Sequence, residues 1–179
     1  MHIDRDDFLR WAYSDFLSNR ERGVLAEYIV GKCLDAVSEK RTEWDAYDLI
    51  TDYGAKIEVK SSAYLQSWKQ TKLSVIRFDI EKKRFWDARA NQSSKIPQRC
   101  SDVYVFCVLT ETDPNRVNPL AIDQWQFFVV STALINAKLG NQQSLSLSHL
   151  KKIAGLGVSH HELADTVKAS YELASKGYR

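Results

Sequence analysis

The segment Val103–Leu109 places the strongest single constraint on the fold of this chain. Its seven residues, VYVFCVL, form a nearly continuous apolar run. Such a run is typical of a strand that is buried on both faces. A sheet that contains it needs other elements packed against both of its sides.

The rest of the chain provides the material for one domain. The 179 residues are 44% hydrophobic and 27% charged, which is ordinary for a soluble domain. Gly and Pro together number only 10, and no linker, repeat or low-complexity tract divides the chain. Residues 1–179 are therefore interpreted as a single domain.

Several features argue against a membrane or secreted protein. No apolar run approaches the roughly 20 residues that span a bilayer. The stretch 1–7 is acidic, whereas a signal peptide begins basic and continues apolar. Cys33, Cys100 and Cys107 are an odd number without CxxC spacing, which argues against a disulfide framework or a zinc knuckle. The sequence predicts a cytoplasmic protein with no membrane partner.

Hydrophobic periodicity and turn signals predict the other elements. Apolar side chains at helical spacing indicate a first helix over 5–18, and a second follows over 19–37 with Ser18 or Asn19 as its N-cap. Helices, three strands in a meander, and then strands mixed with helices predict an α/β (α+β) fold, with a central mixed sheet flanked by helices. The expected strands lie near 44–51, 55–63, 72–80, 103–109 and 124–130, and the expected last helices follow 145–150 and cover 161–173.

The tripeptide Asp52-Tyr53-Gly54 predicts a hairpin with a definite register. It suits a three-residue loop in which a type I turn ends on a left-handed glycine. Asp48 then lies opposite Glu58. Because side chains alternate along a strand, Asp48, Glu58 and Lys60 are expected on one face. Asp45 is expected on the other face, and a two-residue loop would exchange the two aspartates.

Two carboxylates and an ammonium on one face of a hairpin favour a catalytic role over a purely structural one. Like charges repel across a strand pair, and their burial costs desolvation energy. A divalent cation relieves both problems, and Mg²⁺ typically takes one or two carboxylates together with phosphate and water oxygens. The lysine can then contact the scissile phosphate, or orient and deprotonate the attacking water. The alternative is a salt bridge on a solvated surface, which is the better interpretation of an isolated Glu-x-Lys triplet.

The helix over 19–37 offers a third carboxylate. On an ideal helical wheel Glu27 lies at the edge of the apolar arc, away from the polar sector. That sector holds Glu21, Lys32, Asp35 and Glu39. A glutamate turned toward the protein needs a partner. The alternative is a boundary side chain that reaches water.

Three motifs carry a resemblance to a known superfamily. Gly23-Val24-Leu25-Ala26-Glu27, Trp44-Asp45-Ala46-Tyr47-Asp48 and Ile57-Glu58-Val59-Lys60-Ser61-Ser62 resemble the PD-(D/E)xK, restriction-endonuclease-like superfamily. The first and third are similar to archaeal Holliday-junction resolvases and small restriction-like nucleases. The resemblance covers residues 23–62, and the later elements are compatible with the αβββαβ core of the superfamily.

The resemblance implies a role for each site residue. Asp48 and Glu58 would bind Mg²⁺, for which Mn²⁺ can substitute, and the Val59 carbonyl would help. Lys60 would assist the water, and Glu27 would support the metal or its water shell. No proline precedes Asp48, which departs from the nominal superfamily pattern.

A basic block follows the motif. Residues 1–55 carry a net charge of −5, residues 56–100 carry +7, and residues 101–179 are neutral. A concentrated basic segment with interleaved aromatic residues is typical of a surface that binds nucleic acid, although some of the aromatic residues must be core. The expected nucleic-acid contacts are Ser61, Ser62, Gln66, Lys69, Lys72, Arg77, Lys82, Lys83 and Arg84.

The leading hypothesis from the sequence is a metal-dependent DNA endonuclease that hydrolyses phosphodiester bonds. A homodimer is expected if it cuts both strands or a junction, since one site handles one strand at a time. The alternatives are a catalytically silent nucleic-acid-binding protein on the same fold, and an interaction domain with a surface salt bridge.

Overall fold

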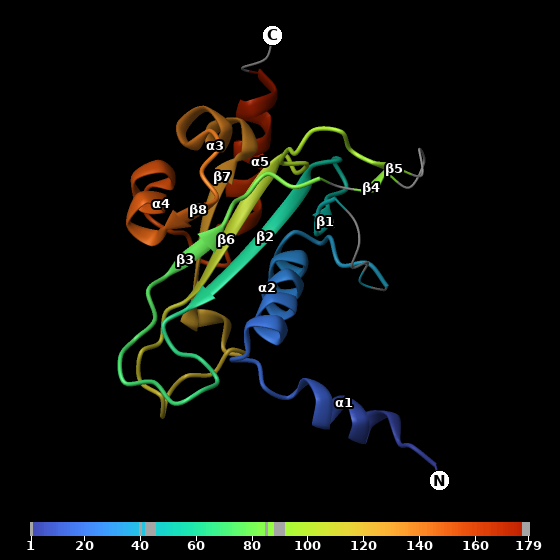
Figure 1. Ribbon diagram of the computed structural model, residues 1–179, viewed down its shortest axis with the longest axis vertical. Coiled ribbons are helices and arrows are strands. Elements are labelled where there is room, and N and C mark those ends of the chain that lie inside the picture. Colours follow the sequence, from blue (N-terminus) through green and yellow to red (C-terminus); the bar gives the residue numbers. More distant parts are fainter. Residues whose placement is uncertain (1, 40, 42–45, 85, 88–91, 177–179) are drawn as a thin grey trace.

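The computed structural model describes residues 2–39, 41, 46–84, 86–87 and 92–176 (Figure 1). The helices are α1 (Arg5–Tyr13), α2 (Asn19–Cys33), α3 (Thr132–Leu139), α4 (Leu147–Ala154) and α5 (Leu163–Lys176), with a 3-10 turn η1 (Ile122–Gln124). The strands are β1 (Leu49–Ile50), β2 (Lys56–Ala63), β3 (Arg77–Asp79), β4 (Trp86–Asp87), β5 (Gln92–Ser93), β6 (Val103–Leu109), β7 (Trp125–Ser131) and β8 (Ser144–Ser146).

The central sheet has four strands in the order β1-β2-β6-β7. β1 is antiparallel to β2, β2 is parallel to β6, and β6 is antiparallel to β7. All seven residues of β6 are buried, as its apolar run predicts. The expected α/β (α+β) fold with a central mixed sheet flanked by helices is confirmed.

Helices cover both faces of this sheet (Figure 1). α2 and α5 pack on one face, against Ile57 and Val59 of β2 and alternate residues of β6. α3, α4 and the small β3–β8 sheet pack on the other face, around Phe106 and Phe128. Because side chains alternate along β2, Glu58 and Lys60 point to the α3–α4 side, opposite to α2.

The predicted three-strand meander is wrong. The strand expected over 72–80 is only Arg77–Asp79 and pairs with β8 in a separate sheet. Its apolar residues Ile76, Phe78 and Ile80 are buried on one side, while Arg77 and Asp79 are exposed. A strand with one polar face fits over the sheet, whereas the fully apolar β6 takes the central place beside β2.

The two N-terminal helices are shorter than predicted. α1 ends at Tyr13, and none of its residues is buried. Ser18 caps α2 by accepting a hydrogen bond from the Glu21 N–H, which confirms Ser18 as one of the two expected caps. α2 ends at Cys33 because Asp35 takes a left-handed conformation (φ +51°), which a short polar residue tolerates.

The C-terminal helices agree with the prediction except at their starts. Ser144–Ser146 form strand β8 before α4 begins, so the expected helical lead-in at 145–150 is partly strand. α5 covers most of the expected helix over 161–173. Within the described ranges, the structure contains no helix that is both long and apolar enough to cross a bilayer.

Candidate active site

The β1–β2 hairpin forms as its turn sequence predicts. The Gly54 N–H donates to the Thr51 carbonyl at 3.0 Å, and Gly54 has a φ of +85°, which glycine adopts without a steric penalty. The Thr51 N–H donates to the Ala55 carbonyl at 3.0 Å. Leu49 pairs with Ile57 and Ile50 with Lys56, so the predicted register is confirmed.

Asp48 lies where this pairing ends, and its placement differs from the prediction. Its N–H donates to the Ile57 carbonyl at 3.0 Å, although Leu49 is already paired with Ile57. Regular alternation therefore stops at Asp48. Its Oδ2 accepts the Val59 N–H at 2.7 Å, so the carboxylate lies along the edge of β2 rather than across from Glu58.

The strand expected over 44–51 is correspondingly shorter, with β1 covering Leu49–Ile50. Trp44 and Asp45 fall outside the described residues, and with them the choice between Asp45 and Asp48 as the alternative ligand.

Asp48 is the most strongly perturbed acid of the site. Burial raises its pKa, and the nearby charge of Glu58 raises it further. The Val59 N–H lowers it, Glu27 raises it, and Lys60 lowers it, with a net value of about 7. The side chains of Asp48, Glu58 and Glu27 therefore share one electrostatic neighbourhood.

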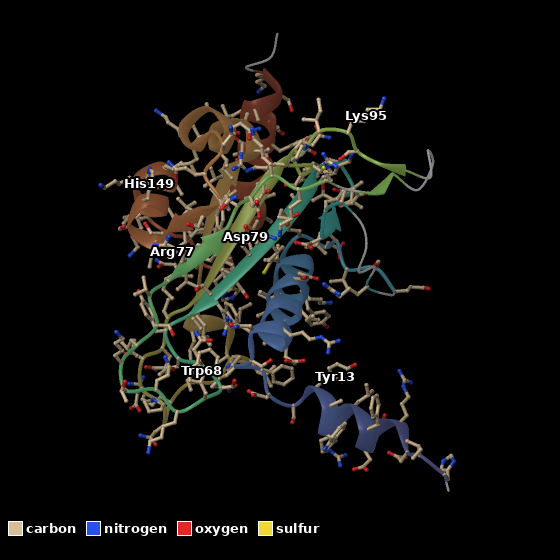
Figure 2. All side chains as sticks on the ribbon, in the orientation of Figure 1. Tyr13, Trp68, Arg77, Asp79, Lys95 and His149 are labelled. Carbon is tan, nitrogen blue, oxygen red and sulfur yellow. The ribbon has the colours of Figure 1, made fainter. Side chains whose placement is uncertain are left out.

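Glu58 and Lys60 form an ion pair on the same strand. Lys60 Nζ lies 2.5 Å from Glu58 Oε1, and both side chains are largely buried. Burial lowers the pKa of Lys60, but the charge of Glu58 and its hydrogen bond outweigh burial, so the net pKa is raised. Asp79 of β3, labelled in Figure 2, also favours the charged lysine. Lys60 is an ammonium in this arrangement.

Glu27 is turned toward the protein, as the helical wheel predicts, and its side chain is 16% exposed. Its partner is Arg41, whose Nε lies 2.5 Å from Oε2 and whose Nη2 lies 2.9 Å from Oε1. Nothing in the sequence pattern indicated Arg41, because it lies beyond the end of α2, 14 residues after Glu27. Only the fold brings the two together.

A cavity of about 440 Å³ adjoins these residues. Glu27 and Tyr28 of α2 line one side, and Arg41, Tyr47 and Asp48 line another. Asp48 therefore borders a hollow with both acidic and basic groups in its wall, and the residues of β2 are not part of that wall.

The donor set suits a hard divalent cation. Carboxylate and carbonyl oxygens are the ligands that Mg²⁺ prefers. Within the described residues, no three His, Cys, Asp or Glu side chains converge closely enough to hold an ion. The reason is visible in the contacts: Glu58 turns to Lys60 and Glu27 to Arg41, while Asp48 turns to the Val59 N–H. The residues fit a cation in kind and neighbourhood, and binding it requires Glu58 or Glu27 to change partner.

A protein-family model matches most of the chain. The chain matches the model of the Bacteriophage T4 endonuclease IV family over residues 11–149. It belongs to this endonuclease family. The matched range contains α2, the hairpin and the whole central sheet, and it stops before α5. No curated protein matches the chain significantly.

In this endonuclease IV family member, the residues expected to touch nucleic acid divide into two groups. Ser62 is buried. Gln66 makes hydrogen bonds within the protein: its Oε1 accepts from Arg22 Nη1 at 3.1 Å, and its Nε2 donates to the Ala63 carbonyl at 2.9 Å. Arg22 is itself 4% exposed at the start of α2, and burial lowers its pKa. Gln66 therefore holds the loop after β2 against α2.

The basic residues of the other group are mostly exposed. Lys69 and Lys72 lie in the loop after β2, near Trp68, which is labelled in Figure 2 and is 56% exposed. On and after β3, several bases have hydrogen-bond partners in the protein: Arg77 with Ser144, Lys82 with Asn141 and Lys83 with Asp79. Ser61 is half-buried and Arg84 is exposed. Lys69 and Lys72 lie at the carboxyl end of β2, the strand that carries Lys60.

Proposed function

We propose that this chain is a metal-dependent DNA endonuclease that hydrolyses phosphodiester bonds, with a site of the PD-(D/E)xK type. One observation carries the proposal. A half-buried Asp48 lies beside Glu58 and Glu27, just before β1 at the edge of β2, and β2 also carries the Lys60 ammonium. Membership of an endonuclease family supports phosphodiester hydrolysis as the reaction proposed for this cluster.

Asp48 and Glu58 would hold Mg²⁺ or Mn²⁺, with the Val59 carbonyl as a further oxygen and Glu27 as support. The Val59 N–H points to Asp48, and the N–H and C=O of one strand residue face the same side. The Val59 carbonyl therefore faces the edge where Asp48 lies. When bound, the cation would neutralise charge on the phosphate and lower the pKa of a coordinated water.

Lys60 would act as a cation toward the substrate. Its ammonium is held by Glu58, so it does not accept a proton in this arrangement. If Glu58 turns toward a metal, the ammonium becomes available to donate to a phosphate oxygen, where negative charge develops during hydrolysis.

DNA is the proposed polyanion. The exposed Lys69, Lys72, Arg77, Lys83 and Arg84 belong to the segment with a net charge of +7. Such bases contact phosphates without reading sequence. A homodimer is proposed for cleavage of both strands, since each copy has one such site.

A cleavage assay tests the proposal. Wild-type protein, Asp48→Asn and Lys60→Ala are incubated with linear, supercoiled and branched DNA in Mg²⁺ or Mn²⁺. Metal-dependent cleavage by the wild type alone is expected. Cleavage that survives both substitutions would refute the site. Salt-sensitive DNA binding without cleavage of any substrate would instead indicate a silent binding protein.

A further inference from the structure

The two cationic partners in the site differ in how they are held. Lys60 and Glu58 lie two residues apart on the same strand, so the backbone itself keeps them together. Arg41 reaches Glu27 from a separate segment, and its side chain is 39% exposed. Of the two cations, Arg41 has the shorter path to solvent.

Arg41 binds both oxygens of Glu27. The two contacts, 2.5 and 2.9 Å, form the forked pairing that a guanidinium makes with a carboxylate. A carboxylate held in this way has neither oxygen directed at a metal ion. Glu27, Arg41 and Asp48 all line the same cavity, so a cation that enters beside Asp48 meets the Arg41 charge there.

Charge counting shows what this pairing does. Asp48, Glu58 and Glu27 bring three negative charges when ionised, and Lys60 and Arg41 bring two positive ones. With both cations in place, a dication would therefore leave the cluster with a net charge of +1. Without Arg41 the charge of the dication balances the net charge of the remaining four side chains. The repulsion between the Arg41 guanidinium and the dication is then removed.

We propose that Arg41 competes with the divalent cation for Glu27 and so weakens metal binding by this endonuclease until it leaves Glu27. The inference rests on the proposed function, because it assumes that a metal binds beside Asp48. It makes Arg41 a regulator of metal affinity that acts through Glu27.

Calorimetric titration with Mn²⁺ alone tests this, using the full chain. Arg41→Gln is expected to bind Mn²⁺ roughly tenfold more tightly than wild type, within the usual range of coupling between two binding events. In a Glu27→Gln background, Arg41→Gln should bring no further gain, since the competition needs the carboxylate. In EDTA, Arg41→Gln should unfold at a lower temperature than wild type, because half-buried Glu27 loses its partner.

Lys56→Gln is the matched control. It removes one positive charge beside the same cavity, where Lys56 Nζ lies 5.4 Å from the ring centre of Tyr47, but leaves Glu27 paired. Its effect on Mn²⁺ affinity should stay below about twofold, because solvent screens an exposed charge.

The outcomes separate the two proposals. Wild type that binds Mn²⁺ while Arg41→Gln binds no more tightly, or gains no more than Lys56→Gln, overturns the competition and leaves the metal site standing. A gain that persists in the Glu27→Gln background overturns it as well. Absence of Mn²⁺ binding in every variant overturns both proposals.

Discussion

β2 and β6 are neighbours paired in parallel over seven residues, yet β2 carries residues of the candidate site and β6 lies in the core. β6 has a strand on each side and packing on both faces, and all of it is buried. Among the described residues, β2 has no second paired strand beyond Ile57, and this part of β2 carries Glu58 and Lys60. Glu58 and Lys60 lie where this pairing is incomplete and the Val59 N–H of β2 can bind the Asp48 side chain.

Lys60 of β2 and Phe106 of β6 are partners in the parallel ladder, so substitutions at these two positions compare the two strands directly. Phe106→Ala should lower the free energy of unfolding by about 3–5 kcal/mol, because it opens a cavity in a fully buried position. Urea denaturation followed by circular dichroism measures this. A loss below about 1 kcal/mol would mean that β6 is not the centre of the core.

Lys60→Met at the partner position should instead act on catalysis. DNA cleavage should fall about 100- to 1,000-fold, which is the usual cost of removing one electrostatic donor from a reacting centre. Its free energy of unfolding should change far less than that of Phe106→Ala. Lys56→Met, on the same strand but exposed, is the control and should keep most of the cleavage rate. Equal losses of the cleavage rate in Lys60→Met and Lys56→Met would contradict a specific role of Lys60 in catalysis.

The edge position of Asp48 predicts an unusual pH dependence of stability. Its pKa is about 7 in the fold and near 4 when unfolded. Between these values the folded chain holds the extra proton, so stability without metal should fall as pH rises from about 4 to 7 and then level off.

Asp48→Asn should remove that fall and raise the stability at pH 8 by about 2 kcal/mol when EDTA is present. Urea titrations at pH 5 and pH 8 give both values. Adding Mg²⁺ should stabilise the wild type at pH 8 and leave Asp48→Asn unchanged. A wild-type stability that does not change between pH 5 and pH 8 would contradict a protonated Asp48.

The smallest expected effect is on DNA binding by the loop that follows β2. Lys69→Gln combined with Lys72→Gln should weaken DNA binding a few-fold and reduce the salt dependence by about two counterions. Fluorescence anisotropy over a range of salt concentrations measures the slope. Lys168→Gln combined with Lys176→Gln, both on α5, is the comparison, because it removes the same positive charge from a different element. An unchanged slope in the double variant would remove the loop from the DNA-binding surface.

Local rules predicted much of what surrounds the site. The turn at 52–54 and the register of Leu49 with Ile57 follow from three residues and one left-handed glycine. The cap at Ser18 and the buried strand Val103–Leu109 follow from patterns equally short in range. The predicted meander is wrong because the strand order depends on which segments are apolar on both faces. That order follows from a comparison among distant segments and not from the pattern of any single segment.

The sequence by itself determined where the candidate side chains point: Glu58 and Lys60 share a face of β2 because side chains alternate, and Glu27 turns inward because of its helical phase. Only the tertiary structure decided their partners. Asp48 leaves the regular ladder to accept the Val59 N–H, and Arg41 pairs with Glu27. The physical reason is the distance along the chain over which each effect acts. Periodicity acts over a few residues, whereas a buried charge takes its partner from whatever the fold brings within reach.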